Sequence, residues 1–449
     1  MVKSTLELPE KLSADKSFSL KFSPENFKSI SAGILVLLPY ITRYGIYEAI
    51  KKSGYPETKT ISRISSILSF VALKASNIRR YSSDDRWCMD RGTGLFAGLN
   101  VLPNAAWYTS YSHRVTTDMN IRFLKSLHKI WLDNGLLGDT SNLDFTTIPY
   151  WGEDEHLENN WSGKRGKALA SMLAVLAHNP DTGIINYGNA NVMHKEESYE
   201  VLEFLDFYKS SRSGGNQLKY LVFDSKFTNY ENLGKLDHNG IKFITIRRRG
   251  KNIVNRLENI PSGKKKKIRV EMAGNKKRSL WVLDEQVHIR GYGKIIRQVS
   301  ITGHGRIKPA IIITNDFDLG VENIVRKYAK RWIVEKAISE QVSFFHLNLV
   351  SSSMVIKVDF DLVMSILTHN IFRLFAMDLK RYSHLSDQSL FDKFILNSAD
   401  IEILPDVIKV NLKKKRNLPL ILEEMGKFNS YNYPWLNNLK LHFFGASYS

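Results

Sequence analysis

The sequence predicts an α/β protein in which a helical N-terminal domain precedes a mixed sheet flanked by helices. Three observations support this prediction. From Asn142 onward, runs rich in β-branched and aromatic residues alternate with amphipathic helical patterns. Before that point, the apolar residues recur at helical spacing. A basic stretch with further strand-like runs, residues 247–316, interrupts the alternation and is predicted to be a β-rich insertion.

The N-terminal part divides into a polar arm and a helical domain. Residues 1–28 are polar and of mixed composition. Residues 29–137 contain the helix-period segments SRISSILSFVALKASNIRRY and TTDMNIRFLKSLHKIWLDNGLL, separated by a stretch with Gly and Pro. We therefore predict a helical domain whose surface carries basic and aromatic side chains.

The central region predicts five strands and two helices across residues 138–246. The run LDFTTIPYW reads as the first strand, and two more strands flank the turn at residues 179–183. The amphipathic helix KEESYEVLEFLDFYKSS leads to LKYLVFD, a short apolar strand with both faces buried. A short helix closed by Asn239 and Gly240 then precedes the strand IKFITIRR. This order suits three antiparallel strands followed by parallel ones. Residues 317–380 complete the domain, and residues 381–449 form a C-terminal region that could support dimerisation.

The charge of the chain points to a polyanionic partner. The formal net charge is +19 over 449 residues, which favours nucleic acid first and an anionic membrane surface second. Residues 247–278 contain 13 Lys or Arg and only two acids, Glu258 and Glu271. Such a skew favours a surface that faces phosphates and positions DNA without reading its sequence. The basic residues expected to do so are Arg247, Arg248, Arg249, Lys264, Lys265, Lys266, Lys267, Lys276, Lys277 and Arg278.

Cysteine usage and hydropathy bound the remaining possibilities. Cys88 is the sole cysteine, which excludes an internal disulfide and multi-cysteine zinc or iron–sulfur sites and suits a reducing interior. The longest apolar stretch, AGILVLLPYI from Ala32, is about half the roughly 20 residues that a membrane span needs. We expect no signal peptide and no membrane partner.

One helix places ions where apolar residues are expected. In VENIVRKYAKRWIVEKAISEQV, a wheel of about 100° per residue puts Ile324, Val325 and Tyr328 on one apolar stripe. Arg331 and Glu335 fall on the same face. Burying a charge is costly unless it is paired or coordinates a metal. The helix is therefore predicted to cover a site that uses these ions.

Three acids could meet beneath that helix. Asp144 lies within the first strand, where an aspartate is disfavoured, and Asp224 ends the buried strand LVFD, at the edge where α/β sheets bind ligands. Together with Glu335 they would form a set of oxygen donors suited to two Mg²⁺ ions, with Mn²⁺ as an alternative. Each acid also has a simpler explanation: Asp144 could end a turn, Asp224 could cap the next segment, and Glu335 could pair with Arg331.

The motifs resemble a known family. Tyr328, Arg331 and Glu335 match the first three positions of the signature Tyr-x2-Arg-x3-Glu-x6-Lys, and Trp332 follows the arginine. The segments LDFTTIPYWG and LVFDSKFTNYENLGKLDHNGIKFITIRRR resemble the surroundings of the first and second catalytic Asp of insertion-sequence DDE transposases with that Tyr-Arg-Glu-Lys signature. The resemblance covers about residues 142–379. The signature Lys position is occupied by Val342.

The resemblance implies a fold, a chemistry and partners. It implies an RNase H-like catalytic domain in which Asp144, Asp224 and Glu335 bind two Mg²⁺, and an N-terminal DNA-binding domain. It implies cleavage at the ends of the element and strand transfer without a covalent protein–DNA intermediate, often through a DNA hairpin. Tyr328, Arg331 and Trp332 would contact the transposon end, and Trp281 would offer a platform for a flipped base. It also implies double-stranded terminal repeats and target DNA as partners, a homodimer in the DNA complex, and a prokaryotic cytoplasmic location at the nucleoid.

Two other classes of protein remain open. One is a transposase-derived protein that binds terminal repeats without cutting them, which Val342 favours. The other is a related RNase H-like metal nuclease, which the insertion and the Tyr-Arg-Glu spacing disfavour. Metal-dependent strand transfer separates the transposase from both alternatives.

Overall fold

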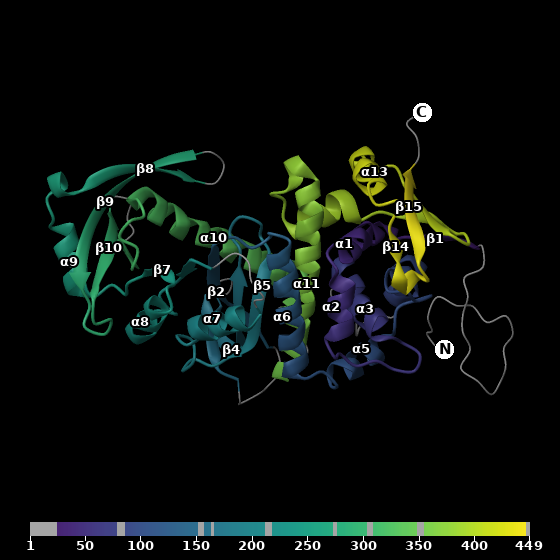
Figure 1. Cartoon of the computed structure of the whole chain (residues 1–449), viewed down its shortest axis with the longest axis horizontal. Coiled ribbons are helices and arrows are strands. Elements are labelled where there is room, and N and C mark those ends of the chain that lie inside the picture. The colour runs from purple at the N-terminus through teal and green to yellow at the C-terminus, as the bar shows by residue number, and fades with distance from the viewer. Residues whose placement is uncertain are drawn as a thin grey trace. The chain divides into compact units, whose positions relative to one another are not determined.

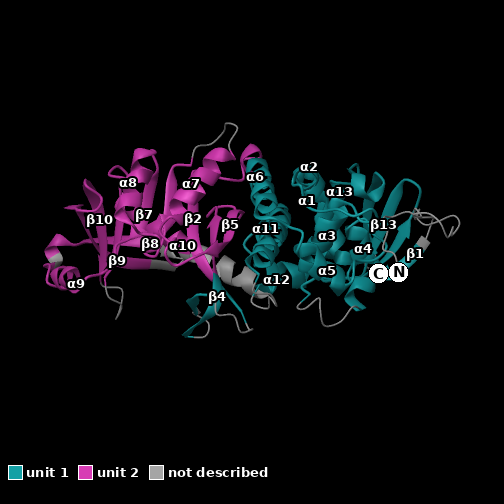
Figure 2. Ribbon diagram, turned by 90° about the horizontal axis from the view of Figure 1, so that it is seen from below, with its two compact units in different colours: residues 1–130, 147–172, 339–449 teal, residues 131–146, 173–338 magenta. Residues whose placement is uncertain are grey.

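The computed structural model describes residues 25–78, 86–150, 157–162, 166–211, 218–272, 276–302, 309–347 and 354–445. Within helices and strands, side chains are described except at residues 25, 162, 262, 271–272, 276–277 and 332–343. The chain forms two compact units, which Figure 2 colours separately. Unit 1 comprises residues 1–130, 147–172 and 339–449, and unit 2 comprises residues 131–146 and 173–338.

Unit 2 is built on a mixed sheet. The strand order is β4-β2-β6-β7-β11-β10-β9-β8, with β5 paired to β4 and the short β3 beside the start of β4 in unit 1. The strands are β2 (Thr140–Pro149), β3 (Asn159–Ser162), β4 (Lys167–His178), β5 (Ile185–Val192), β6 (Tyr220–Phe223), β7 (Lys242–Ile246), β8 (Lys266–Met272), β9 (Lys276–His288), β10 (Ile295–Thr302) and β11 (Ala310–Thr314).

The topology confirms the predicted RNase H-like α/β fold. Strands β4 and β5 are antiparallel, whereas β6 is parallel to both β2 and β7. Helix α7 (Glu200–Ser210) connects β5 to β6, and α8 (Tyr230–His238) connects β6 to β7. Figure 1 labels both helices. Helix α8 ends where the sequence predicted, and Gly240 adopts φ of 73°, a left-handed conformation that costs glycine little.

The basic insertion extends the central sheet. Strand β11 pairs antiparallel with β7, and β10, β9 and β8 follow as antiparallel neighbours. The insertion was predicted to be β-rich, and no helix was predicted within it, whereas the structure also contains α9 (Lys251–Glu258). Because that helix is short, its apolar positions 253, 254 and 257 give only one turn of helical periodicity.

One hydrophobic cluster ties the insertion to the helix that follows it. Ile268, Val282 and Val299 from the insertion strands pack with Val222 and Ile244 from the central strands. Ile324, Val325 and Tyr328 belong to the same cluster, and they lie on α10 (Val321–Phe344). Helix α10 therefore lies on one face of the sheet, and that face includes strands of the insertion.

Unit 1 combines a helical region with a small sheet. The sheet order is β1-β12-β13-β15-β14, so that the strand preceding the helices pairs with strands near the C-terminus. Apart from β3 and the ends of β2, β4 and α10, the α-helices and strands among the described residues of this unit are β1 (Glu25–Ser29), α1 (Leu38–Arg43), α2 (Ile46–Lys52), α3 (Arg63–Ala75), α4 (Arg91–Phe96), α5 (Ala105–Ser112), α6 (Thr117–Asp133, ending in unit 2), α11 (Val355–Asp378), α12 (Asp387–Leu390), β12 (Ala399–Ile403), β13 (Val407–Leu412), α13 (Leu418–Gly426), β14 (Asn432–Tyr433) and β15 (Leu439–Gly445).

Helix α11 is the core helix of unit 1. It is long and apolar enough to cross a membrane by length and composition, but 83% of its apolar window is buried inside the protein. Tyr55 illustrates the polar network nearby: its hydroxyl donates to Asn120, whose amide donates to Asp359 on α11. The predicted N-terminal and C-terminal segments thus share one compact unit, while the six-part division of the chain stays a prediction.

Candidate active site

The two aspartates occupy equivalent positions on neighbouring strands. Strands β2 and β6 are parallel, and Leu143 is in register with Phe223. Asp144 and Asp224 are the next residues of the two chains. Because Leu143 and Phe223 are paired, the two acids that follow them lie beside each other, Asp224 just after the end of β6 and Asp144 within β2. This placement agrees with the convergence that the sequence predicted.

Asp144 is a buried carboxylate held by two donors. Its side chain is 9% exposed, and one carboxylate oxygen accepts a hydrogen bond of 2.9 Å from the amide of Phe145. The other oxygen lies 3.0 Å from the guanidinium of Arg331, whose side chain is 6% exposed. The buried arginine predicted from the helical wheel is therefore real, and its charge is compensated by Asp144.

Asp224 begins a tightly bonded loop. It is half-buried, and its carboxylate accepts a hydrogen bond of 2.8 Å from the amide of Lys226. Its carbonyl accepts another from the hydroxyl of Thr245 on β7, at 3.1 Å. Phe227 in the same loop stacks on Phe145, with ring centroids 4.0 Å apart. The residues that follow each aspartate thus brace each other.

Tyr328 completes the described part of the site. Its ring is buried with the apolar cluster beneath α10. Burial raises the pKa of Tyr328 to about 12, with Asp224 and Asp144 adding to the rise and Arg331 opposing it. The phenol therefore remains neutral at physiological pH. Tyr328, Arg331, Asp144 and Asp224 are brought together as the sequence predicted.

The other predicted residues of α10 lie partly beyond what is described. Trp332, Glu335 and Val342 fall within the helix, but their side chains lie outside the described residues. Among the described residues, no group of three or more His, Cys, Asp and Glu side chains could hold a metal ion. The side chain of Glu335, the expected third ligand, lies outside those residues.

The start of α10 is fixed by polar contacts on both sides. Lys327 donates to Thr140 at 2.7 Å, and Lys330 pairs with Asp181 at 2.6 Å. The loop before α10 is held by Arg297 on β10, which binds Asp284 on β9 with two nitrogens. The same guanidinium also donates to the carbonyls of residues 316, 317 and 319. Sequence reasoning missed this arginine, although a charged residue in the strand-like run IIRQVSI was a visible signal.

The predicted DNA-binding residues of the insertion have differing surroundings. Arg247 donates to Gln298 at 2.7 Å, and Arg249 donates to the carbonyl of Pro309. Lys264, Lys266, Lys267, Arg248 and Arg278 are exposed, and Lys265 is half-buried. The side chains of Lys276 and Lys277 lie outside the described residues. The described cations thus include several exposed enough to meet a phosphate.

Trp281 lies on the opposite face of the sheet from Tyr328. Its neighbours Leu280 and Val282 belong to the cluster beneath α10, and side chains alternate between faces along a strand. The Trp281 ring is 39% exposed, and Lys267 on β8 lies 5.8 Å from its centroid. The structure therefore does not bring Trp281 together with the described site residues on one face.

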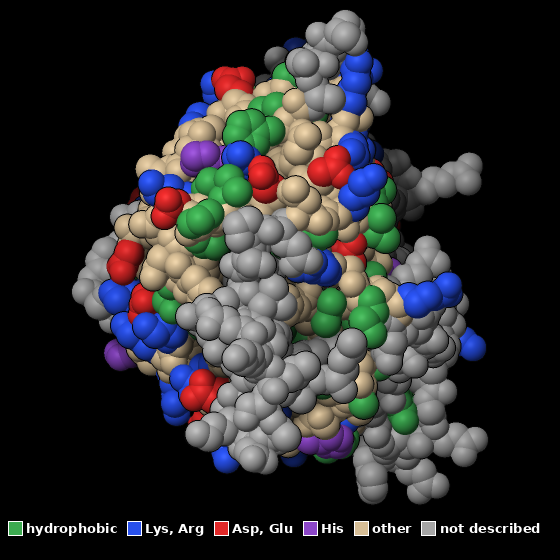
Figure 3. Space-filling view, turned by 90° about the vertical axis from the view of Figure 1, so that its right-hand side faces the viewer, with side chains coloured by type: hydrophobic (Ala, Val, Ile, Leu, Met, Phe, Trp, Pro, Cys, Tyr) green, Lys and Arg blue, Asp and Glu red, His purple; other side chains and the backbone are tan. Residues whose placement is uncertain are grey.

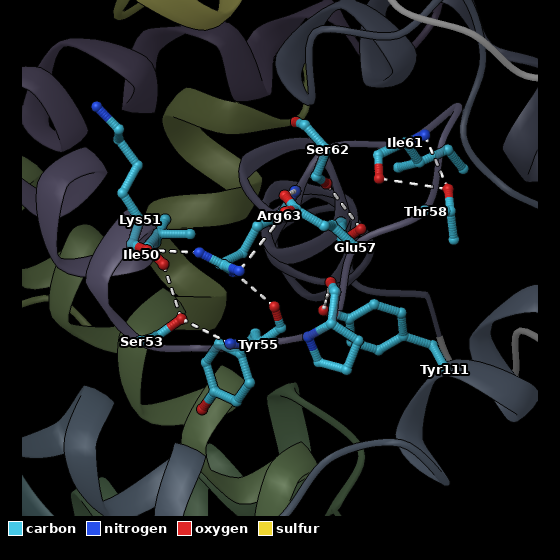
Figure 4. Close-up of polar contacts among 12 residues, drawn as sticks. Ile50, Lys51, Ser53, Tyr55, Glu57, Thr58, Ile61, Ser62, Arg63 and Tyr111 are labelled. Carbon is cyan, nitrogen blue, oxygen red and sulfur yellow. Dashed lines mark hydrogen bonds and ion pairs between the residues drawn. The ribbon is translucent and has the colours of Figure 1, made fainter.

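In the N-terminal region, α3 is closed to partners. Every residue from Ile64 to Ala75 is buried, so this helix cannot enter a DNA groove. Polar contacts hold the loop before it, as Figure 4 shows: Arg63 donates to the carbonyls of Tyr55 and Lys51 at 2.6 and 2.7 Å and pairs with Glu57. Exposed surface is instead offered by this loop and by α6.

Helix α6 carries a basic stripe beside that loop. Arg122, Lys125 and Lys129 lie at spacings of three and four residues, which places them on one helical face. Arg122 lies against this loop at Gly54: its guanidinium nitrogen is 3.0 Å from the position that a Cβ atom would take on that glycine. On the side of the molecule shown in Figure 3, by contrast, cations and acids are intermixed.

Comparison with known proteins gives one family match. Residues 140–371, just over half of the chain, match the family described as "Transposase DDE domain". No curated protein matches the chain. Among solved structures, the chain is similar to the piggyBac transposase in its synaptic complex with hairpin DNA, determined by cryo-EM. That alignment has 11% sequence identity and a TM-score of 0.41 and covers 83% of this chain and 82% of the other.

Proposed function

The chain belongs to the transposase DDE domain family, and on that premise we propose that it is an active DNA transposase. In this proposal it binds the terminal inverted repeats of an insertion sequence, cleaves DNA at the ends of the element and joins the freed 3′-hydroxyl to a target. It belongs to the group with the Tyr-Arg-Glu-Lys signature and works as a homodimer on DNA, at the nucleoid of a prokaryotic cell.

The register of Asp144 and Asp224 beneath α10 carries this proposal. Two carboxylates on adjacent parallel strands supply hard oxygen donors at one sheet edge, and such donors suit Mg²⁺ or Mn²⁺ better than zinc. Glu335, one helical turn beyond Arg331, would supply the third carboxylate. Two bound Mg²⁺ ions would activate a water and stabilise the leaving oxygen of the phosphodiester.

The protein's own residues have distinct tasks in this scheme. Asp144 and Asp224 hold their oxygens at fixed positions because the sheet and the loop after β6 constrain both backbones. Arg331 neutralises Asp144 in the absence of another cation and is placed to transfer to a phosphate of the transposon end. Tyr328 is buried and stays neutral, and its ring centroid lies 5.4 Å from the Arg331 guanidinium, so in this scheme it helps to position Arg331.

In this proposal, the exposed basic residues of unit 1 recognise the DNA end. Helix α3 is buried, whereas the end of α2 offers Lys51 and the α6 stripe offers Arg122, Lys125 and Lys129 at or near the surface. Contacts from such side chains fix DNA through its phosphates. The basic strands of the insertion provide a second set of phosphate contacts.

Cleavage of a labelled duplex carrying the element's own terminal repeat tests the proposal. Wild type with Mg²⁺ is expected to cut the repeat end. Glu335→Gln and Asp144→Asn are expected to lower the rate by at least about a thousandfold while DNA binding is kept, because each removes a metal-binding carboxylate. Glu322→Gln is the matched control, since Glu322 is exposed on the same helix, and it should cut at the wild-type rate.

Two results would redirect the assignment. End binding without cleavage by any variant, in Mg²⁺ or Mn²⁺, would make the chain a binding-only descendant of a transposase. Cleavage that leaves no product joined to a target duplex would instead make it an RNase H-like nuclease.

A further inference from the structure

Lys226 lies beside the site, and the proposed chemistry gives this lysine no task. Its backbone amide donates to the carboxylate of Asp224 at 2.8 Å. Its ammonium group lies 5.6 Å from the centroid of Phe145, the residue next to Asp144. One lysine therefore contacts Asp224 directly and the immediate neighbour of Asp144. Its side chain is 43% exposed, so it remains open to solvent and to a substrate.

The loop that carries Lys226 is firmly held. The hydroxyls of Thr228 and Thr245 lie 2.9 Å apart, and the Thr228 hydroxyl donates to the carbonyl of Ile246 at 3.2 Å. Phe227 is buried and stacks on Phe145 with an interplanar angle of 8°. Since the backbone is fixed on both sides of Lys226, only its side chain is free to select a partner.

The present partner of Lys226 is weakly bound. The ammonium lies 3.6 Å from the carboxylate of Glu197, longer than a charge-assisted hydrogen bond of about 2.7–2.9 Å. Exposed ion pairs of this kind contribute little to stability. Arg331, Lys327 and Lys330 are engaged more closely, at 3.0 Å or less from Asp144, Thr140 and Asp181. Lys226 is thus the cation at this edge most easily given up to a phosphate.

We propose that Lys226 binds a DNA phosphate next to the scissile one, and that Glu197 competes with DNA for this lysine. The inference rests on the proposed function, because it takes the edge carrying Asp144 and Asp224 as the place where DNA is cut. A phosphate, with its full charge and several acceptor oxygens, displaces the long contact to Glu197. The lysine then draws the backbone of the DNA strand toward the two aspartates.

Opposite effects of two substitutions test the inference. Lys226→Ala should weaken binding of the terminal-repeat duplex at least threefold at about 0.1 M salt and reduce the slope of log affinity against log salt by about one unit. Glu197→Gln should tighten binding, since it removes the competing carboxylate. If the pair were purely structural, both variants would shift DNA binding in the same direction. Lys226→Arg should restore most of the affinity.

Lys219 provides a matched control. It is an exposed lysine directly before β6, whereas Lys226 follows the opposite end of that strand. Lys219→Ala should therefore leave affinity and salt slope unchanged. Thermal unfolding of each variant, measured alongside binding, shows whether any loss of affinity comes from misfolding.

The outcomes separate this inference from the proposed function. Normal cleavage by wild type together with unchanged binding by Lys226→Ala would overturn the inference alone. If wild type binds DNA without cutting it, the active transposase is excluded, while the salt slopes still decide whether Lys226 contacts phosphate. Absence of any DNA binding by wild type would overturn both.

Discussion

At the scale of single residues, the most informative contact is the buried pair between Arg331 and Asp144. Removing one partner of a buried ion pair leaves an uncompensated charge, which typically costs about 3–5 kcal/mol. The wheel predicted a buried cation on α10, but it could not name the partner, because Asp144 lies 187 positions away along the chain. Only the packing of α10 across β2 brings the two charges together.

Substitution of Arg331 should change how strongly divalent metal stabilises the protein. Arg331→Met is expected to lower the melting temperature without metal, since Asp144 stays buried with the amide of Phe145 as its remaining described donor. Mn²⁺ should raise the melting temperature of this variant more than that of wild type, because the metal ion replaces the lost positive charge. Equal Mn²⁺-induced shifts in both proteins would argue against Asp144 as a metal ligand. Arg326→Met, at an exposed position of the same helix, is the control.

At the scale of elements, the periodicity of apolar residues located more of the strands and helices than amino-acid composition did. Alternation and short apolar runs located β4, β5, β6 and β7, and helical spacing identified the buried face of α10 through Ile324 and Val325. Helix α9 was missed because a helix of eight residues shows little more than two turns. The pairing of β7 with β11 was also beyond reach, since strand partners are chosen by packing rather than by local sequence.

The hydrophobic cluster beneath α10 should lose stability when one of its buried side chains is made smaller. Ile244 on β7 is fully buried in the cluster that contains Tyr328. Ile244→Ala is expected to lower the free energy of local unfolding by about 2–5 kcal/mol, from lost burial and the cavity left behind. Hydrogen exchange in the β6 and β7 peptides measures this directly. Ile295 on β10 is 56% exposed, and Ile295→Ala should change exchange by no more than about 0.5 kcal/mol.

At the scale of the whole molecule, the sequence indicated a basic, β-rich insertion within an α/β fold, and in the structure strands β8 to β11 extend the central sheet. It did not indicate that residues before 130 and after 339 form one unit. One of the contacts that join these parts is the pairing of β1 with β12, between Glu25 and Ile403 at one end. No local pattern reports a strand pair so distant in sequence. The net charge of +19 pointed to a polyanion but not to the surface that meets it.

The stability of the molecule should also depend on pH through Glu200. Burial first, and then repulsion from Glu203, raise the pKa of the Glu200 carboxyl to about 7 from its ordinary 4.5. The unfolded chain therefore releases this proton before the folded protein does. The resulting stabilisation is complete below about pH 4.5 and is lost as pH rises through about 7. The loss amounts to about 3 kcal/mol.

Glu200→Gln tests this dependence. Chemical unfolding from pH 5 to pH 8 should show a smaller decline in the variant than in wild type, because glutamine has no proton to lose. Glu203→Gln, on the same helix, should reduce the decline only in part, since it removes a repulsion and not the titrating group. A decline identical in all three proteins would mean that another group controls it.

The pairing of β7 with β11 has a consequence for how such a chain can diverge. The segment between these strands leaves the central sheet at β7 and returns to it at the adjoining strand β11. Lengthening a surface loop costs little entropy, so its turns can grow or shrink across a lineage without displacing Asp224 or α10. The alternating apolar residues of β8 and β9 cannot change in this way, because they form part of the surface on which Tyr328 packs. They are Ile268, Val270, Leu280 and Val282. Within this one segment, the turns should therefore vary in length between relatives, while the alternation of apolar residues along its strands stays constant.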